Sequence, residues 1–322
     1  MSAPFFLHPC PIIAFTMHLP FVYHTDYVTP LPPGHRFPMP KFAEVYRILL
    51  EDNIATSGQF HMPEIATRDI LQLVHSKSYV DAFCDGTLDR QAERRIGLPW
   101  STGLVKRTRT AVGGTILTAK LALEHGIACN TAGGTHHAFP DYGSGFCIFN
   151  DLAIAARYML ETDQAKRILI IDLDVHQGDA TALTFANEPA VFTFSMHCGV
   201  NFPFRKQQSA LAIEQTVGMT DSDYHAGQEK HRGRLLSEVN PDLVIYDAGV
   251  DPHIDDSLGK LSLSDYGLYQ RDCKVIDRCL ANGFPIATVI GGGYDKDISA
   301  LARRHSIVHR AANDLTKQLH RA

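Results

Sequence analysis

The chain has 322 residues and a mass of 35.6 kDa, enough to bury the core of one large domain. Hydrophobic residues make up 45% of it and charged residues 20%, which excludes an intrinsically disordered or fibrous chain. The formal net charge of −5 lacks the basic excess of most nucleic-acid-binding proteins, and no uncharged apolar run reaches the roughly 18 residues of a membrane-spanning helix. We therefore expect no membrane span and no direct nucleic-acid partner, and a location in the cytoplasm, or in the nucleus if the source is eukaryotic.

The cysteines indicate a reducing compartment. There are seven of them, an odd number, and none form a C-x-x-C pair. This pattern argues against a disulfide framework and against a cysteine-based zinc site. The seventeen histidines are more informative, because histidine serves in metal binding and in proton transfer near neutral pH.

The N-terminal part of the chain is irregular. Residues 1–18 contain three prolines and no basic stretch, so they make a poor signal peptide. We expect them to form an extension that could be disordered, and Met17 is an alternative start. Residues 31–40 are proline-rich and predict an extended loop, and the apolar spacing of the next residues predicts a helix over Lys41–Glu51.

Further along, predicted helices alternate with apolar runs typical of buried parallel strands. The predicted helices cover residues 104–125, 150–161, 264–282 and 298–320. The predicted strands cover residues 126–130, 167–172, 190–195, 243–247 and 285–290. This alternation predicts a single α/β domain with a central parallel sheet and helices on both faces. Ligands of such sheets bind beyond the carboxyl ends of the strands, and four polar clusters of this chain follow strand ends.

The first polar cluster follows the strand at residues 167–172. Asp174 and His176 are two residues apart, so in an extended chain they point to the same side and could hold one ion. A carboxylate with an imidazole suits zinc or iron(II) better than magnesium. A capping turn is the alternative, but three carboxylates at one buried strand end (Asp172, Asp174 and Asp179) would be unfavourable without a cation.

The second and third clusters add histidines and a carboxylate. His136 and His137 follow a glycine pair, and they could be metal ligands, an acid/base pair or surface residues. Asp172 and Asp179 are available to orient two imidazoles. Asp251, after the strand at residues 243–247, could complete a three-ligand set with a free position for water and substrate, as in catalytic zinc sites.

The fourth cluster consists of three glycines at residues 291–293 and Tyr294. The glycines allow the backbone to approach a ligand closely, and the tyrosine offers one O–H donor. A phosphate-binding loop is the alternative. However, no Lys-Ser/Thr pair follows, and the glycine spacing differs from that of dinucleotide-binding loops.

In this order, the segments GGTHHA, GFCIFND, DLDVHQGD, GVD and GGGY resemble the zinc-dependent histone deacetylase family, which has the arginase/deacetylase fold. The run HRFPMPKF at residues 35–42 resembles its class IV branch and bacterial relatives. The resemblance extends over most of the chain, so residues 19–322 would form the catalytic domain. It implies a zinc-dependent amidohydrolase that removes acetyl or longer acyl groups from the ε-amine of lysine in proteins.

The resemblance implies two ions. Zinc, with iron(II) as an alternative, would be bound by three side chains: Asp174, His176 and Asp251. A structural potassium ion would be held by five neighbouring residues: Asp172, Asp174, His176, Ser195 and Met196.

The resemblance also implies catalytic roles. His137 would act as general base and then as general acid, oriented by Asp179. His136 would be its electrostatic partner, oriented by Asp172. Tyr294 would donate a hydrogen bond to the substrate carbonyl.

A narrow tunnel for the acyl-lysine chain follows from the same resemblance. Its expected wall residues are Gly134, Gly145, Phe146 and one of Phe202 and Phe204. Arg36 would line an acetate-exit cavity, or else form a salt bridge that anchors the proline-rich loop. Residues 94–100 lack an obvious counterpart of the aspartate with which many relatives grip the substrate. Trp100, in this region, would pack internally or shape the rim.

Other functions remain open. Small acylated amines such as acetylpolyamines could be the substrates, and the acyl group could be a long fatty chain, since tunnel depth decides its length. A non-catalytic acyl-lysine-binding protein would have lost a ligand, the histidine pair or the tyrosine, and all are present. Arginase-like manganese chemistry would need a second full set of carboxylate ligands.

Overall fold

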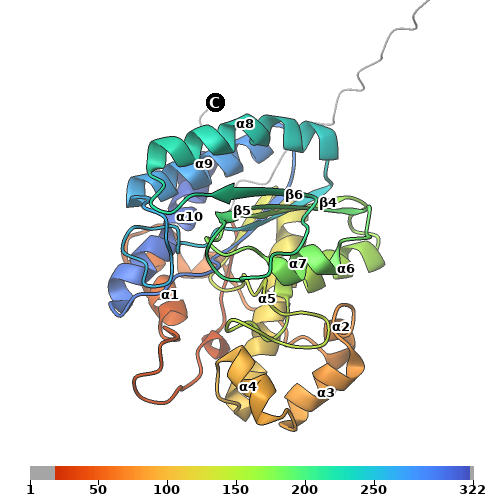
Figure 1. Ribbon diagram of the computed structural model, residues 1–322. Coiled ribbons are helices and arrows are strands. Elements are labelled where there is room, and N and C mark those ends of the chain that lie inside the picture. The colour runs from red at the N-terminus through yellow and green to blue at the C-terminus, as the bar shows by residue number, and fades with distance from the viewer. Residues whose placement is uncertain (1–18, 320–322) are drawn as a thin grey trace, which may run out of the picture.

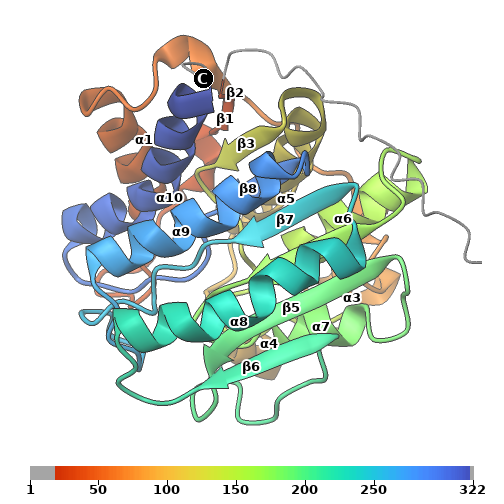
Figure 2. The same ribbon diagram turned by 90° about the horizontal axis from the view of Figure 1, so that it is seen from above.

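One parallel sheet of eight strands organises the protein, and our computed structural model describes residues 19–319 of it, apart from the side chains of residues 229–234 (Figures 1 and 2). The strand order is β2-β1-β3-β8-β7-β4-β5-β6, and every pair is parallel. The strands are β1 Phe21–Val22, β2 Phe60–His61, β3 Ile127–Asn130, β4 Ile168–Asp172, β5 Val191–Cys198, β6 Leu211–Gln215, β7 Leu243–Asp247 and β8 Ile286–Val289. Because all strands run the same way, their carboxyl ends meet at one edge.

Helices cover both faces of the sheet, which confirms the predicted architecture. On one face lie α1 (Lys41–Glu51), α8 (Asp221–Val239), α9 (Asp265–Ala281) and α10 (Ile298–Leu319) (Figure 1). On the other lie α5 (Thr102–His125), α6 (Asp151–Glu161) and α7 (Asp179–Thr184) (Figure 1). Beyond α5 and α6, three shorter helices close the molecule: α2 (Arg68–Leu71), α3 (Lys77–Asp85) and α4 (Arg90–Ile96). No helix in residues 19–319 is both long and apolar enough to cross a bilayer.

The central strands have the apolar sequences from which they were predicted. All residues of β3, β4, β7 and β8 are buried, because helices cover both faces. In the register of the sheet, Asp172 at the end of β4 lies level with Ser195 of β5 and Asp247 of β7. Polar side chains from three strands are therefore brought together at the same edge.

Several elements differ from the sequence-based expectation. Strands β1 and β2 have two residues each, too few for a periodic pattern, and β6 is a half-exposed edge strand. Strand β5 continues beyond residue 195 to Cys198, so Ser195 and Met196 lie within it. Helix α8 was not predicted because its sequence is largely polar. The proposed extension of residues 1–18 lies outside the described residues.

A buried histidine fixes the loop of residues 139–150, which later forms one wall of the site. His75 Nδ1 lies 2.9 Å from the carbonyl oxygen of Phe139, and the backbone N–H of Asn150 donates to His75 Nε2 at 2.9 Å. With Nδ1 donating to a carbonyl oxygen and Nε2 accepting from an N–H, the His75 ring must be neutral. Burial lowers the pKa of His75 to about 4.

Acid is therefore expected to destabilise the fold through His75. Its folded pKa lies below the usual 6.5, so stability is complete above pH 6.5 and falls as the pH approaches 4. The expected contribution is a loss of about 2 kcal/mol in the free energy of unfolding between pH 7.5 and pH 5. In denaturant titrations, His75→Gln should reduce the difference in the free energy of unfolding between pH 7.5 and pH 5 by about 2 kcal/mol. An unchanged difference would contradict the assignment of a neutral His75.

Candidate active site and metal centre

Three side chains from two strand ends converge on one point. Asp174 and His176 follow β4, and Asp251 follows β7. His176 Nδ1 lies 3.1 Å from Asp174 Oδ1 and 3.0 Å from Asp251 Oδ2, and one ligand atom of each residue falls within 4.8 Å of the others. All three are buried, and neither carboxylate is paired with a lysine or arginine of residues 19–228 or 235–319. Two buried carboxylates with an imidazole and no cationic partner fit a divalent metal ion.

Backbone and side-chain donors hold these ligands in place. The N–H of Val175 donates to Asp251 Oδ1 at 2.8 Å, and the N–H of Gly292 donates to Asp174 Oδ2 at 2.8 Å. Behind them, the buried Arg271 of α9 donates to the carbonyl oxygens of Leu173 and Gly249 at 3.2 and 2.7 Å. Through these hydrogen bonds, Arg271 connects the loops that follow β4 and β7. Its role was not predictable from the sequence, because an arginine in an amphipathic helix carries no local signal of it.

The two histidines form a pair beside this centre. His136 Nε2 and His137 Nε2 are 3.1 Å apart, and His137 Nδ1 lies 2.7 Å from Asp179 Oδ1. Burial and the neighbouring His136 lower the pKa of His137 to about 4, so this ring is neutral near pH 7. A neutral imidazole that is hydrogen-bonded to a carboxylate is the form that can accept a proton.

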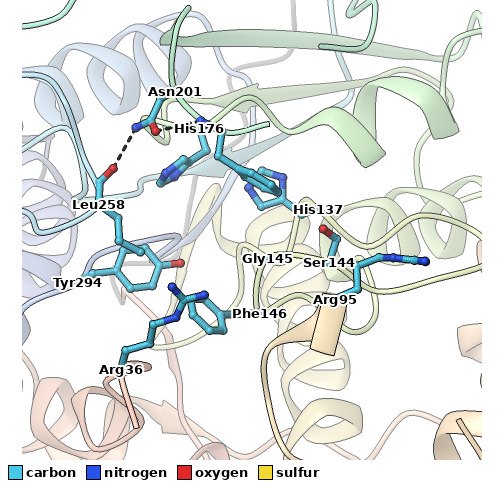
Figure 3. A pocket seen from close by; sticks show the side chains of 11 residues that line it. Arg36, Arg95, His137, Ser144, Gly145, Phe146, His176, Asn201, Leu258 and Tyr294 are labelled. Carbon is cyan, nitrogen blue, oxygen red and sulfur yellow. Dashed lines mark hydrogen bonds between the residues drawn. The ribbon is translucent and has the colours of Figure 1, made fainter. Parts of the chain in front are cut away.

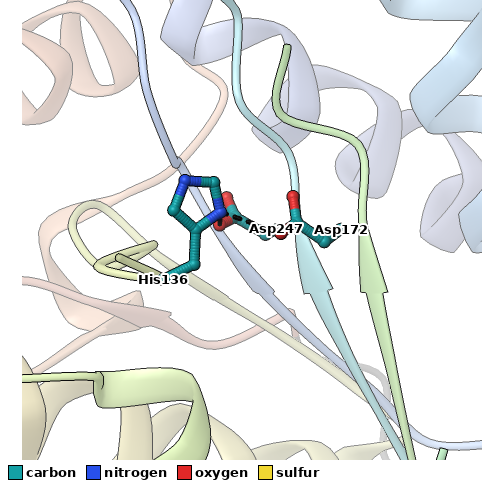
Figure 4. A group of neighbouring side chains, drawn as sticks. All are labelled: His136, Asp172 and Asp247. Atoms are coloured by element: carbon teal, nitrogen blue, oxygen red, sulfur yellow. Dashed lines mark hydrogen bonds and ion pairs between the residues drawn. The ribbon is translucent and has the colours of Figure 1, made fainter. Parts of the chain in front are cut away.

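His136 is in a different electrostatic environment (Figure 4). Its Nδ1 lies 2.8 Å from Asp172 Oδ2 and 3.7 Å from Asp247 Oδ2. Burial alone would lower the pKa of His136, but the charges of Asp172 and Asp174 outweigh it and raise this pKa well above its ordinary value. The pair therefore combines a neutral and a charged ring.

Asp247 is a member of this cluster for which the sequence suggested no role. It is completely buried, and neither carboxylate oxygen has a hydrogen-bond partner among residues 19–319. Burial and the neighbouring Asp172 raise the pKa of Asp247 well above its usual range. Only the register of β4 and β7 shows that these two carboxylates lie side by side, both directed at Nδ1 of His136 (Figure 4).

Tyr294 and Lys41 form the side of the site opposite the histidine pair. The Tyr294 ring lies 6.5 Å from that of His176, and its hydroxyl points into the cavity (Figure 3). Burial and nearby carboxylates raise the pKa of Tyr294 well above 10, so the phenol keeps its proton as a donor. Lys41 is buried behind it and donates to the carbonyl oxygen of Gly293 at 3.3 Å. Burial lowers the pKa of Lys41 to about 8.

A cavity of about 380 Å³ leads to these groups (Figure 3). Phe146 and Phe202 lie in its wall, with ring centroids 5.8 Å from Tyr294 and 4.9 Å from His137, respectively. Gly145 lies between them at φ +55°, where an added Cβ would come within 3.0 Å of His137 and 3.1 Å of Phe202. A side chain at this position would therefore narrow the cavity.

Two tunnel expectations, those for Gly134 and Arg36, require correction, and the alternative between Phe202 and Phe204 is decided. Phe204 is 88% exposed and does not line the cavity, so Phe202 is the wall residue of the two. Gly134 lies behind the site, where a Cβ would approach the Cα of Gly291 to 2.4 Å. Arg36 is not a buried cavity residue. It is exposed, has no salt bridge within residues 19–319, and places its guanidinium 4.8 Å over the Phe146 ring.

The positions of Lys41 and Trp100 complete the comparison with the residues expected around the cavity. Lys41, five positions after Arg36, is the buried cation of this segment, since Arg36 precedes the point at which the chain turns inward at Phe37. Trp100 packs against α3, with its indole N–H donating to the carbonyl oxygen of Phe83 at 2.7 Å. It is not among the residues that line the cavity.

Substitution of the two phenylalanines should separate their roles. Phe202→Ala removes one wall of the cavity and is expected to lower kcat/KM for an acylated peptide about tenfold, through loss of apolar contact with the substrate chain. Phe204→Ala is the matched control and should stay within twofold of the unmodified protein. Steady-state kinetics on one peptide provide the comparison, and equal effects would contradict the assignment of Phe202.

The residues expected to hold potassium lie next to the metal centre. Asp172, Asp174 and His176 are at the end of β4, and Ser195 and Met196 are in the adjacent β5. All five are buried. The Ser195 hydroxyl lies 2.9 Å from His197 Nδ1.

Known proteins are similar to this chain in both sequence and fold. Residues 35–310 match the family described as the histone deacetylase domain. The chain is 60% identical over 299 residues to an uncharacterized protein of Picosynechococcus sp., covering 93% of this chain and all of that protein. It is 31% identical over 272 residues to histone deacetylase 2 of Arabidopsis thaliana, covering 81% of this chain and 70% of the relative.

Solved structures agree at the level of the fold. The HD domain of HDA15 has a TM-score of 0.74 at 20% identity, with 94% of both chains covered. An HDAC homolog complexed with SAHA has a TM-score of 0.77 at 24% identity, with 94% of this chain and 88% of that chain covered. The fold and the site define a hydrolase of the deacetylase type. The chain belongs to the histone deacetylase family.

Proposed function

We propose that this protein is a zinc-dependent amidohydrolase that removes acyl groups, acetyl or longer, from the ε-amine of lysine in proteins or peptides. The proposal is carried by one observation: the histidine pair, the Tyr294 hydroxyl and the three candidate metal ligands meet at one cavity. The ring of His137 is 6.0 Å from that of His176, and His136 Nε2 is 3.9 Å from Asp174 Oδ1. We assign the catalytic domain to residues 19–322.

Asp174, His176 and Asp251 would hold the zinc ion, or iron(II) in its place. When bound, the ion supplies Lewis acidity that polarises the amide carbonyl and makes a water molecule easier to deprotonate. We also assign a structural potassium ion to Asp172, Asp174, His176, Ser195 and Met196, whose buried oxygen atoms suit a hard cation.

The protein's own residues carry the protons. His137 is neutral, so it accepts a proton as the water oxygen attacks the carbonyl carbon, and Asp179 stabilises the resulting imidazolium. Tyr294 donates its O–H to the developing oxyanion. The C–N bond then breaks, and the proton returns from the histidine pair to the leaving nitrogen. The products are a free amine and a carboxylate.

A panel of acyl-lysine peptides tests the proposal. The peptides should share one sequence and carry acyl groups from acetyl to myristoyl, with acetylpolyamines assayed alongside and products detected by mass spectrometry. We expect release of the free lysine peptide and strong inhibition by a hydroxamate, since this group chelates zinc while its oxygens reach His136, His137 and Tyr294. Absence of hydrolysis for every member with zinc bound would refute the proposed reaction.

A further inference from the structure

Three arginines surround the mouth of the cavity, and we call them the arginine rim: Arg36, Arg95 and Arg205. Arg36 and Arg95 line the cavity itself, beside Phe146 and Ser144 (Figure 3). Arg95 and Arg205 line an adjoining depression of about 500 Å³. The two hollows share Arg95, Ser144 and Phe202, so they adjoin each other, and each of the three arginines lines at least one of them.

The charges of the arginine rim are not neutralised within the described part of the chain. All three residues are exposed, and none forms an ion pair with a side chain of residues 19–228 or 235–319. Aromatic rings hold two of them in position: the Arg36 guanidinium lies 4.8 Å from the Phe146 centroid, and that of Arg95 lies 4.6 Å from the Tyr142 centroid. Stacking on a ring orients a guanidinium and leaves its charge and N–H donors available.

Carboxylates near the mouth are few, and two of them, Asp179 and Asp256, are already engaged in hydrogen bonds. No aspartate or glutamate lines the cavity. Asp179 is the one carboxylate that lines the adjoining depression, and it is buried and hydrogen-bonded to His137. Asp256, close to Leu258 of the cavity wall, accepts backbone N–H groups, including that of Tyr294. Asp141, beside Tyr142, is the exposed carboxylate next to this region. The mouth is thus basic, in a chain whose net charge is −5.

We propose that the arginine rim selects acylated amines that carry carboxylates close to the acylated nitrogen. This inference rests on the proposed function and specifies its substrate class. Guanidinium groups bind carboxylates in a bidentate manner and repel cations, so they favour acidic partners and oppose basic ones. Polycations such as acetylpolyamines and lysine-rich tails are poor substrates on this basis. The carboxylates come either from acidic side chains of a protein or from the α-carboxylate of a free acylated amino acid.

Matched substrates test the selection. Three acetyl-lysine peptides of equal length should carry aspartate, glutamine or lysine at the flanking positions, and free Nε-acetyl-lysine should be compared with its α-amide. Because an exposed ion pair changes binding roughly two- to fivefold, the rim should make kcat/KM about tenfold higher for the acidic than for the basic peptide. The ratio should shrink in 0.5 M salt through screening. A preference for the acidic peptide indicates a protein source, and a preference for the free α-carboxylate indicates a small molecule. Equal rates for all charge types overturn the proposal.

Variants connect this preference to the arginine rim. Arg95→Gln should reduce the acidic-to-basic ratio at least twofold, whereas Arg94→Gln, an exposed neighbour on α4 that lines neither hollow, should leave the ratio unchanged. Fluorescence anisotropy of labelled peptides on Tyr294→Phe provides a readout independent of turnover. Tighter binding of the acidic peptide without hydrolysis by the unmodified protein would refute the proposed reaction but support the selection. Equal binding of acidic and basic peptides would refute the selection even if hydrolysis occurs.

Discussion

Removal of the bound divalent cation is expected to abolish hydrolysis, and zinc or iron(II) should restore it. Asp174, His176 and Asp251 converge without a lysine or arginine partner among the described side chains of residues 19–228 and 235–319, so the ion is needed both to balance their charge and to polarise the amide. Dialysis against a chelator, elemental analysis and an activity assay on the same sample provide the measurement. Full activity in a metal-free sample would rule out the proposed centre.

Single substitutions refine this result. Asp174→Asn and Asp251→Asn keep the side-chain shape and remove one negative charge, so each should weaken metal binding by orders of magnitude. Asp277→Asn is the matched control, since Asp277 is exposed on α9 and belongs to neither metal-ligand group. Metal content after gel filtration should fall for the first two variants only. A full complement of metal in either would exclude that residue as a ligand.

Tyr294→Phe is expected to lower kcat about 10²–10³-fold with little change in KM, since the hydroxyl acts on the oxyanion and not on the bound amide. Metal content should stay near that of the unmodified protein, because no ligand is removed. His137→Ala should lower kcat at least as far, because the histidine that accepts the water proton is lost.

Kinetics and metal analysis on the same preparations distinguish this role from simple packing. If Tyr294 only packed beside the glycine turn, phenylalanine would be tolerated and kcat would remain near its original value. Such a result would show that the tyrosine is not the oxyanion donor. A loss of metal together with activity would instead place Tyr294 among the groups that shape the metal centre.

The central fold was predictable because its signals are local. Strands β4 and β7 are apolar up to their final aspartates since helices bury both faces, and α5 and α6 begin after capping residues, Ser101 and Asn150. The short β1 and β2 and the polar α8 lacked such signals. They depend on contacts with the rest of the domain, which no local pattern shows.

The sequence alone determined the chemical inventory: the metal-ligand types at a strand end, the paired histidines with two spare carboxylates, and the glycine turn before Tyr294. Only the tertiary structure decided which side chains share a site, because that depends on strand register and on the path of the loops. It placed Asp247 beside Asp172 at His136, chose Phe202 over Phe204, and buried Lys41 while leaving Arg36 at the rim. The arginine rim likewise exists only in three dimensions, since its members lie on three segments far apart in the chain that converge where the cavity opens.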